Sequence, residues 1–252
     1  MNNTFSFERF VKVLKYDLKF RVPAIGISFL ILLLLPHVFK FIMDFGGTFH
    51  QNIRKEVIEI LCVIFIMYAP FKIYSSIREK QGRSAFMMLP ASTLEKFASM
   101  VLVSLVMVPA LFLTGSFIVD SLFAVAYRDV YIGMITFPFA GSFAGFIKPA
   151  IMIFALVGSA LSGNAFFRKK AFAKTILCIL CMLFLWASVV LEYISDHLVK
   201  IAWGGTDGTA AQLAEMGFTS EQLYTVSGIV FTLVGILFYV FAYWRMKKMQ
   251  LS

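Results

Sequence analysis

Residues 22–43 read VPAIGISFLILLLLPHVFKFIM, an apolar block in which Lys40 carries the single formal charge. A helix needs about 20 such residues to cross a bilayer core about 30 Å thick. Five further blocks of similar length follow along the chain, at 57–77, 97–123, 147–167, 175–196 and 224–244. The sequence therefore predicts an all-α, polytopic membrane protein with about six transmembrane helices.

The composition supports this fold class and argues against a soluble one. Of the 252 residues, 60% are apolar and 15% are charged, and the mean hydropathy is +0.84. A soluble domain carries far more charge on its surface. Six spans and their loops occupy the whole length, so we expect residues 1–252 to form a single membrane domain. The first block shows no small-residue cleavage site at its end, which predicts a retained span.

The net charge of +9 reflects topology rather than nucleic-acid binding. Lys and Arg gather in the cytoplasmic loops of membrane proteins. With the N-terminus inside, seventeen of the 23 basic residues fall in inner segments and six at outer positions. The bias predicts that both termini are cytoplasmic and that no nucleic acid is bound. The segments predicted to lie inside are 1–21, 78–96, 168–174 and 245–252.

The segment before the first span predicts an amphipathic helix. Residues 5–20 read FSFERFVKVLKYDLKF, and Lys12, Lys15 and Lys19 fall opposite an apolar face. Basic amphipathic helices of this kind lie in the plane of the lipid headgroups, so we expect contact with membrane lipid. A helix that binds a partner protein is the alternative. The apolar face consists of Phe7, Phe10, Val11, Leu14 and Leu18.

The most informative loop separates the second and third blocks. Residues 76–96 read SIREKQGRSAFMMLPASTLEK, in which Phe86–Leu89 is apolar but too short to span a membrane. Ser92 and Glu95 have the spacing of a capping box, in which two side chains satisfy the first amides of a helix reciprocally. Capping does not explain an apolar patch among basic residues. Exposed patches of this kind mark contact with a partner.

The run from Met88 to Phe97, MLPASTLEKF, resembles the Leu-Pro-x-Ser-x-x-Glu-Lys segment of bacterial permease subunits of the type-2 ABC exporter family. The resemblance extends to the layout: an amphipathic elbow helix, two spans, a short inner loop and four further spans. A helical insert also precedes the last span in this layout. Two possible capping boxes, at 209–212 and 219–222, predict such an insert here, with an outer helix at about 210–216.

The resemblance implies the membrane half of an ATP-driven exporter in a bacterial inner membrane. It also implies a dimer with a second permease copy or paralogue, and a separate cytoplasmic ATPase subunit docked on the inner loop. The sequence contains no Gly-x-x-x-x-Gly-Lys-Ser/Thr phosphate loop, so we expect no enzymatic activity and no cofactor in this chain. The residues that the resemblance assigns to docking are Arg78, Glu79, Lys80, Arg83, Phe86, Met87, Met88, Leu89, Glu95 and Lys96.

Other functions remain open at this point. A membrane anchor or sensor subunit that binds a partner without transport has the same sequence features. An ion-coupled carrier needs deep charges and internal repeats, and neither is clear. A rhomboid-type protease is disfavoured because Ala160 replaces the first glycine of its serine motif. No His, Asp or Glu cluster has metal-ligand spacing.

Two carboxylates and one apolar stretch lead to further predictions. Glu59 and Glu192 lie deepest in the predicted spans and are candidates to face a transport pathway, with structural hydrogen bonding as the alternative. The stretch 131–146 is apolar but interrupted by proline and glycine. It is either a re-entrant segment or an outer loop.

Overall fold

The computed structural model describes residues 5–42, 48–133, 143–184, 188 and 220–251. The described chain is mostly helical, and three of its helices are long and apolar enough to cross a membrane. This confirms the predicted helical class, and the long apolar helices are compatible with a protein embedded in a membrane. The three are Phe7–Ile42, Thr93–Ala126 and Gly228–Met249, and the shorter apolar helices are Ala150–Phe166 and Ala171–Phe184.

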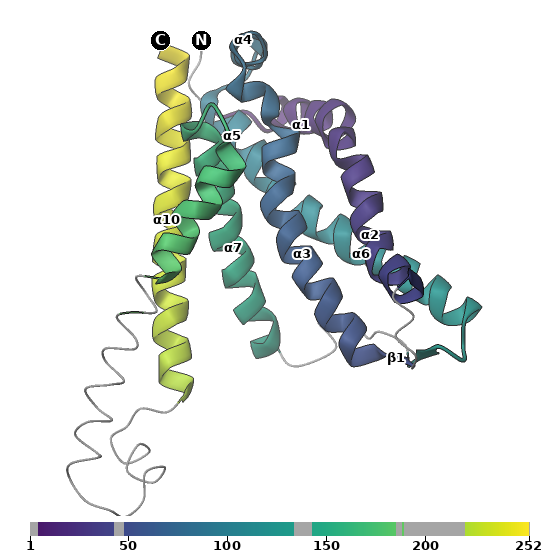
Figure 1. Cartoon of the computed structure of the whole chain (residues 1–252). Helices are drawn as coiled ribbons and strands as arrows, with labels where there is room; N and C mark the ends of the chain where they lie inside the picture. Colours follow the sequence, from purple (N-terminus) through teal and green to yellow (C-terminus); the bar gives the residue numbers. More distant parts are fainter. Residues whose placement is uncertain (1–4, 43–47, 134–142, 185–187, 189–219, 252) are drawn as a thin grey trace, which may run out of the picture.

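The first helical run changes direction before it becomes apolar throughout. Helix α1 (Phe7–Tyr16) is followed by a π-helical turn, Asp17–Arg21, and a 3-10 turn, Val22–Ile25, and then by α2 (Gly26–Ile42). Figure 1 shows α1 lying across one end of the bundle and α2 leaving it at an angle. Pro23 lies in the 3-10 turn; its missing N–H favours a change of helix type there.

The end of the bundle opposite α1 carries a short parallel strand pair. Strand β1 (Phe49–His50) pairs with β2 (Tyr131–Ile132), and α3 (Gln51–Ile73) begins directly after β1. The predicted second span therefore starts later than the helix itself. The first two turns of α3 carry charged residues, which the apolar pattern excluded.

The inner loop is helical and leads into the third predicted span. A 3-10 turn, Ser75–Arg78, precedes α4 (Lys80–Met88), and the next helical run begins with α5 (Thr93–Leu102). A π-helical turn, Val103–Met107, joins α5 to α6 (Val108–Ala126). Pro109 has no N–H for the hydrogen-bond ladder of this continuous helical run, which fits the change from π-helix to α-helix just before it.

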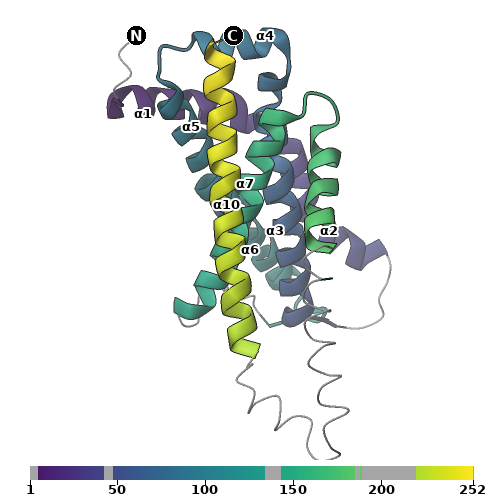
Figure 2. The same ribbon diagram turned by 90° about the vertical axis from the view of Figure 1, so that its left-hand side faces the viewer.

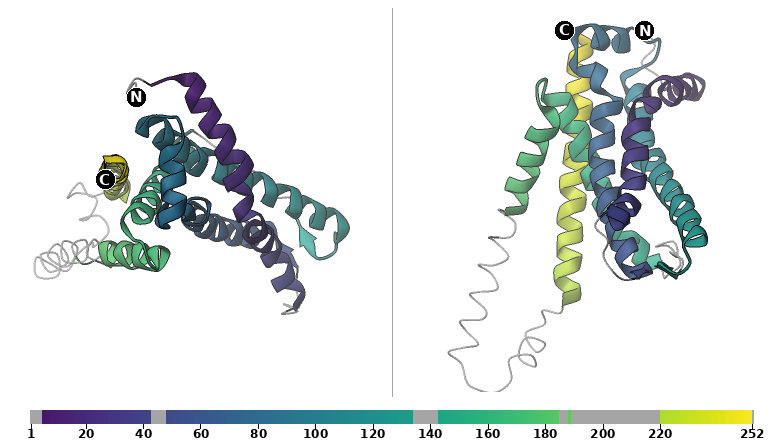
Figure 3. Two further views of the ribbon diagram at one scale, coloured as in Figure 1. Left: turned by 90° about the horizontal axis from the view of Figure 1, so that it is seen from above. Right: turned by 45° about the vertical axis from the view of Figure 1, so that its right-hand side comes forward.

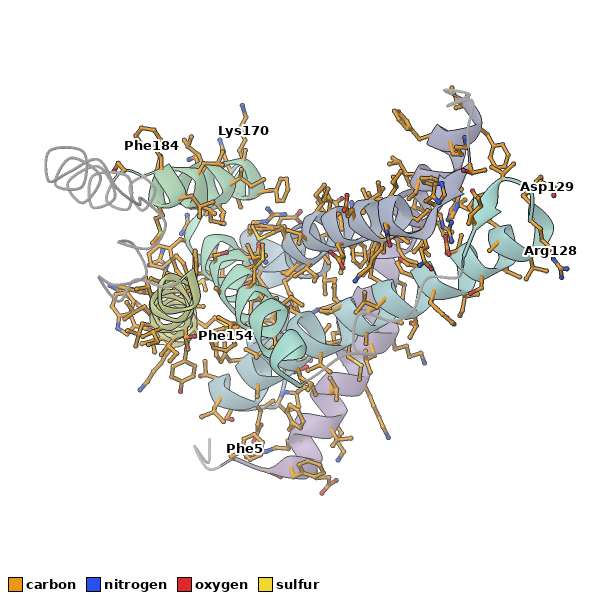
Figure 4. The ribbon with its side chains drawn as sticks, turned by 90° about the horizontal axis from the view of Figure 1, so that it is seen from below. Phe5, Arg128, Asp129, Phe154, Lys170 and Phe184 are labelled. Carbon is orange, nitrogen blue, oxygen red and sulfur yellow. The ribbon has the colours of Figure 1, made fainter. Side chains whose placement is uncertain are left out.

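Helices α7 (Phe143–Phe166) and α10 (Ser220–Leu251) run side by side along the bundle (Figure 2). They approach closely at two glycines: a Cβ on Gly158 would lie 2.9 Å from the Tyr239 ring, and one on Gly235 would lie 2.9 Å from Phe154. Phe154 lies between the two helices (Figure 4), and its carbonyl accepts a 3.1 Å hydrogen bond from the Tyr239 hydroxyl.

The last two predicted spans are described to different extents. The predicted span 224–244 lies within α10. The predicted span 175–196 overlaps the helix Ala171–Phe184, and its remainder falls outside the described residues except for residue 188. The predicted outer helix at 210–216 also lies outside them. Within 131–146, residues 131–132 form β2 and α7 begins at Phe143.

The main core lies where α3 crosses the other helices. Phe65, Ile66, Val103 and Phe112 are fully buried and belong to one apolar cluster. Figures 1 and 3 show α1, α4 and the C-terminus of α10 together at one end of the molecule, and the β1 region at the other. The end with α1 and α4 therefore collects most of the basic residues predicted to lie inside.

Candidate functional site

The predicted capping box at the start of α5 is confirmed. The Ser92 hydroxyl oxygen accepts a 3.2 Å hydrogen bond from the Glu95 amide, and Glu95 Oε2 accepts a 2.8 Å bond from the Ser92 amide. The reciprocal pair satisfies two of the amides that a helix start leaves without intrahelical partners. The inner loop therefore joins α5 in a fixed geometry.

Glu95 also ties the inner loop to the N-terminal segment. Its Oε1 accepts hydrogen bonds from the Ser6 amide at 2.7 Å and from Arg9 Nη2 at 3.0 Å, and its side chain is fully buried. Burial raises the pKa of the Glu95 carboxyl, but the amides of Ser6 and Ser92 and the Arg9 guanidinium outweigh it and hold this pKa below its ordinary value. The capping role follows from the sequence, whereas no local pattern indicates the link to α1.

Phe86 is buried, and the prediction that it forms part of an exposed patch is wrong. Its exposed fraction is 1%. The Arg21 guanidinium carbon lies 4.4 Å from the Phe86 ring centroid, and Lys96 Nζ lies 5.6 Å from it. Aromatic rings attract cations at such distances, most strongly where water is excluded. The Phe86 ring therefore lies between these two cations and the main apolar core.

A buried polar cluster lies beneath α4. Asp17 Oδ1 accepts a 2.8 Å hydrogen bond from Arg21, and Asp17 Oδ2 accepts bonds from the Ser99 hydroxyl at 2.7 Å and the Tyr74 hydroxyl at 3.5 Å. Arg21 thus lies between Asp17 and the Phe86 ring. The cluster joins the turn before α2, the end of α3 and α5 around the inner loop. Sequence reasoning missed it because its members are 57 and 82 residues apart.

Met88 is an exposed apolar side chain of α4. Its exposed fraction is 81%, and Leu89 beside it is half-buried. Glu79 is exposed, and Arg78 and Arg83 are half-buried. Lys96 is fully buried, so it is not available for direct contact with a partner. The two remaining residues assigned to docking, Lys80 and Met87, lie in α4.

The predicted apolar face of α1 lies partly against the protein itself. Phe7 is 71% exposed, while the other four predicted residues are half-buried. Leu14 and Leu18 pack against the main core. The residue that α1 buries most completely is Val13, which the predicted face omitted. Lys12 and Lys15 are exposed, as expected. The half-buried residues of the predicted face are Phe10, Val11, Leu14 and Leu18.

Of the two carboxylates predicted to face a pathway, the structure describes one. The Glu59 side chain is 54% exposed on the bundle surface, where it lies 3.8 Å from Lys55. Glu192 lies outside the described residues. A third carboxylate, that of Asp120, is buried and accepts a 2.9 Å hydrogen bond from Arg54 Nε. Arg54 on α3 and Asp120 on α6 therefore form a buried ion pair.

Arg54 organises the end of the bundle opposite the inner loop. Its guanidinium also donates to the backbone carbonyls of Phe49, Ile132 and Gly133, which joins both strands to α3. Tyr131 contacts the same guanidinium through its ring face. Burial and the nearby Asp120 carboxylate raise the pKa of Tyr131 to about 12. These contacts describe a structural clamp rather than a binding site.

No group of three or more His, Cys, Asp or Glu residues suited to a metal ion occurs in the part of the chain that the structure describes. Comparison of the chain with protein-family models, with curated proteins and with solved structures gives no match in any of the three. The inner loop and its connections to the bundle are therefore the candidate functional site.

Proposed function

We propose that this chain is the membrane-spanning permease subunit of an ATP-driven exporter, with six spans at the predicted positions and α1 as an interfacial elbow helix. The observation that carries the proposal is the connection of the inner loop to three helices at once. The resemblance at 88–97 supplies the family, and the buried contacts of Glu95 supply a physical reason for one of its residues.

In this proposal a separate ATPase binds the loop 78–96 through the exposed side chain of Met88. The loop is well suited to pass on a displacement because its contacts are buried and specific. Movement of α4 acts on Arg21 through the Phe86 ring, and so on the turn between α1 and α2. Movement of the α5 start acts on α1 through Glu95. Packed interiors transmit such displacements because they are nearly incompressible.

The distribution of charge supports the proposed orientation. The end that carries α1, α4 and the C-terminus of α10 also carries most of the seventeen basic residues (Figure 1). In the proposed arrangement this end faces the cytoplasm, where an ATPase and its nucleotide are available, and both termini lie on the same side. Two such chains then surround the pathway, and residues such as Glu59 on the outer surface of one chain become candidates to face the other.

Met88→Asp tests the proposal. The tagged protein is purified in detergent, and a co-purifying protein is identified by mass spectrometry through its phosphate-loop sequence. We expect the wild type to retain this ATPase and Met88→Asp to lose it, because exposed apolar anchors dominate such interfaces. The matched control is Ile132→Asp, which places the same charge on a residue of similar character at the opposite end of the bundle.

Phe86→Asp is unsuitable for this purpose because it places a carboxylate in the core and is expected to unfold the loop. Retention of the ATPase by Met88→Asp would move the docking surface away from α4. If no protein with a phosphate loop co-purifies with the wild type, the transport function is wrong. The chain is then a membrane anchor or sensor subunit.

A further inference from the structure

Four arginines from different parts of the chain meet at one small cavity. It lies at the end of the bundle where α4 and the C-terminus of α10 are neighbours (Figure 2). The cavity volume is about 10 Å³, which is room for one water-sized group. Among the described residues that line it, none is acidic. The four arginines in the lining are Arg78, Arg83, Arg168 and Arg245.

Close backbone packing brings these residues together. A Cβ on Gly82 would collide with the Ser76 carbonyl oxygen, so glycine lets α4 fold back on the turn that carries Arg78. A Cβ on Gly163 would collide with the Thr175 side chain, so glycine also lets the helix Ala171–Phe184 pack against the end of α7. The link between those two helices contains Arg168. The cavity is therefore a consequence of two close helix contacts.

The arginine side chains retain donors for a ligand. Arg78 uses Nη2 in a 3.1 Å hydrogen bond to the Phe71 carbonyl, which leaves its other guanidinium nitrogens. Arg245 Nε is buried without a hydrogen-bond partner. None of the ion pairs in the described part of the chain includes any of the four lining arginines. Four positive charges without a carboxylate repel one another, and an anion between them relieves that repulsion.

Asn164 provides a second and independent indication of a ligand. It is 3% exposed and lines the cavity. Its amide nitrogen donates to the carbonyls of Pro70 and Tyr74, both at 3.3 Å. Its Oδ1 is buried and accepts no hydrogen bond. A buried acceptor without a donor costs free energy, so a ligand that brings a hydroxyl to Oδ1 is favoured here.

We propose that this cavity binds a ligand with a phosphate group and a hydroxyl, with arginine donors on the phosphate oxygens and Asn164 Oδ1 accepting from the hydroxyl. Arginine forks match phosphate oxygens in geometry as well as charge. The ligand hydroxyl fits the cavity beside Asn164 Oδ1, and the phosphate lies at its mouth, where Arg168 is exposed. Inorganic phosphate has its hydroxyl on phosphorus and a phosphatidylglycerol headgroup has its hydroxyls on the glycerol, so both can supply the two groups. Basic pockets between helices at a membrane surface are known to bind anionic headgroups.

The test uses the full chain purified in detergent, with retained lipid counted by native mass spectrometry during titration with phosphatidylglycerol or phosphatidylcholine. We expect the wild type to bind phosphatidylglycerol with at least about tenfold higher affinity than phosphatidylcholine. Arg168→Gln/Arg245→Gln should lower the affinity for phosphatidylglycerol by at least about tenfold, which is the effect of one charge-assisted hydrogen bond. The matched control is Lys169→Gln/Lys247→Gln. It removes the same charge from neighbouring positions that do not line the cavity, and it should bind as the wild type does.

Competition identifies the source of the phosphate. Displacement of the lipid by inorganic phosphate but not by sulfate, which has no hydroxyl at neutral pH, shows that free phosphate also occupies the site. No displacement assigns the site to the lipid headgroup. Equal losses in the two double variants overturn the proposal, since they indicate attraction to the basic end as a whole. So does a wild type that neither prefers phosphatidylglycerol nor binds phosphate. Arg168→Gln alone, at an exposed position, gives a weakened site in a chain with an unchanged thermal midpoint.

Discussion

The backbone amide of Ser6 donates a 2.7 Å hydrogen bond to Oε1 of Glu95, 89 residues further along the chain. The other oxygen of the same carboxylate completes the capping box of α5. One buried side chain therefore holds a helix start and the beginning of the N-terminal segment at the same time. A displacement of either helix changes the position of the other, which makes Glu95 the most direct point at which to test the coupling.

Glu95→Ala should release α1 from the bundle. Loss of the reciprocal cap costs about 0.5–2 kcal/mol of local helix stability, and the contacts to Ser6 and Arg9 are lost with it. The measurement is the maleimide labelling rate of Val13→Cys, which is buried in the intact protein, on a background without the native cysteines. We expect faster labelling in Glu95→Ala. The control is Glu8→Ala, which removes only an exposed pair with Lys12 and should leave the rate unchanged.

The attachment of α1 should also depend on pH. Because the pKa of Glu95 is lower in the folded protein than in an unfolded chain, its ionised form stabilises the fold. This contribution is complete above the unfolded pKa of about 4.3 and is lost as the pH falls through the folded value. Maleimide reacts with the thiolate, so the Val13→Cys rate is divided at each pH by the rate of an exposed reference cysteine. This ratio should be constant from neutral pH to about 5 and rise below that range. In Glu95→Gln the rise attributable to this carboxyl should be absent; an identical acid response in both proteins contradicts the assignment.

The buried pair of Arg54 and Asp120 should dominate stability at the opposite end. Asp120→Ala leaves a buried guanidinium without its carboxylate and should lower the free energy of unfolding by about 3–5 kcal/mol. Replacing both partners with apolar residues, as in Arg54→Met/Asp120→Leu, should recover only part of this loss, because backbone carbonyls of the strand pair then lose the Arg54 donors. Unfolding titrations in detergent measure both. The exposed pair of Lys55 and Glu59 is the control, and its double alanine variant should change stability by less than about 1 kcal/mol.

Gly235 should be intolerant of any larger residue. A Cβ at this position lies 2.9 Å from Phe154 and 3.3 Å from the backbone of Ala155. Gly235→Leu therefore forces α7 and α10 apart and should cost about 1–3 kcal/mol or more of stability. Gly228 on the same helix is the matched control, because its nearest neighbour would be 4.0 Å away. Gly228→Leu should lower the thermal midpoint much less; equal effects would show that the two helices do not pack at Gly235.

The topology can be tested by cysteine labelling from outside intact cells, on a background without the three native cysteines. Cysteines at positions 83 and 170 should stay unmodified because both positions belong to the basic segments predicted to lie inside. A cysteine at position 208 should be labelled. Labelling of position 83 from outside would overturn the orientation and, with it, the docking of a cytoplasmic ATPase.

The sequence by itself determined the features that depend on neighbours along the chain. Apolar blocks of about 20 residues identify long membrane helices because the bilayer requires that length and excludes charge. The capping box of Ser92 and Glu95 is equally local, since its two members are three residues apart and its geometry follows from the first turn of a helix. These predictions needed no knowledge of packing.

Only the tertiary structure decided which side chains of the inner loop face inward. The sequence places Phe86 and Met88 in one apolar patch, but Phe86 is buried on Arg21 while Met88 is exposed. The contact of Ser6 with Glu95 and the four-arginine cavity were equally beyond the sequence pattern. Each depends on segments that are distant along the chain, and no short-range periodicity records such pairings. Burial is set by where other helices lie, and that is a property of the packed bundle alone.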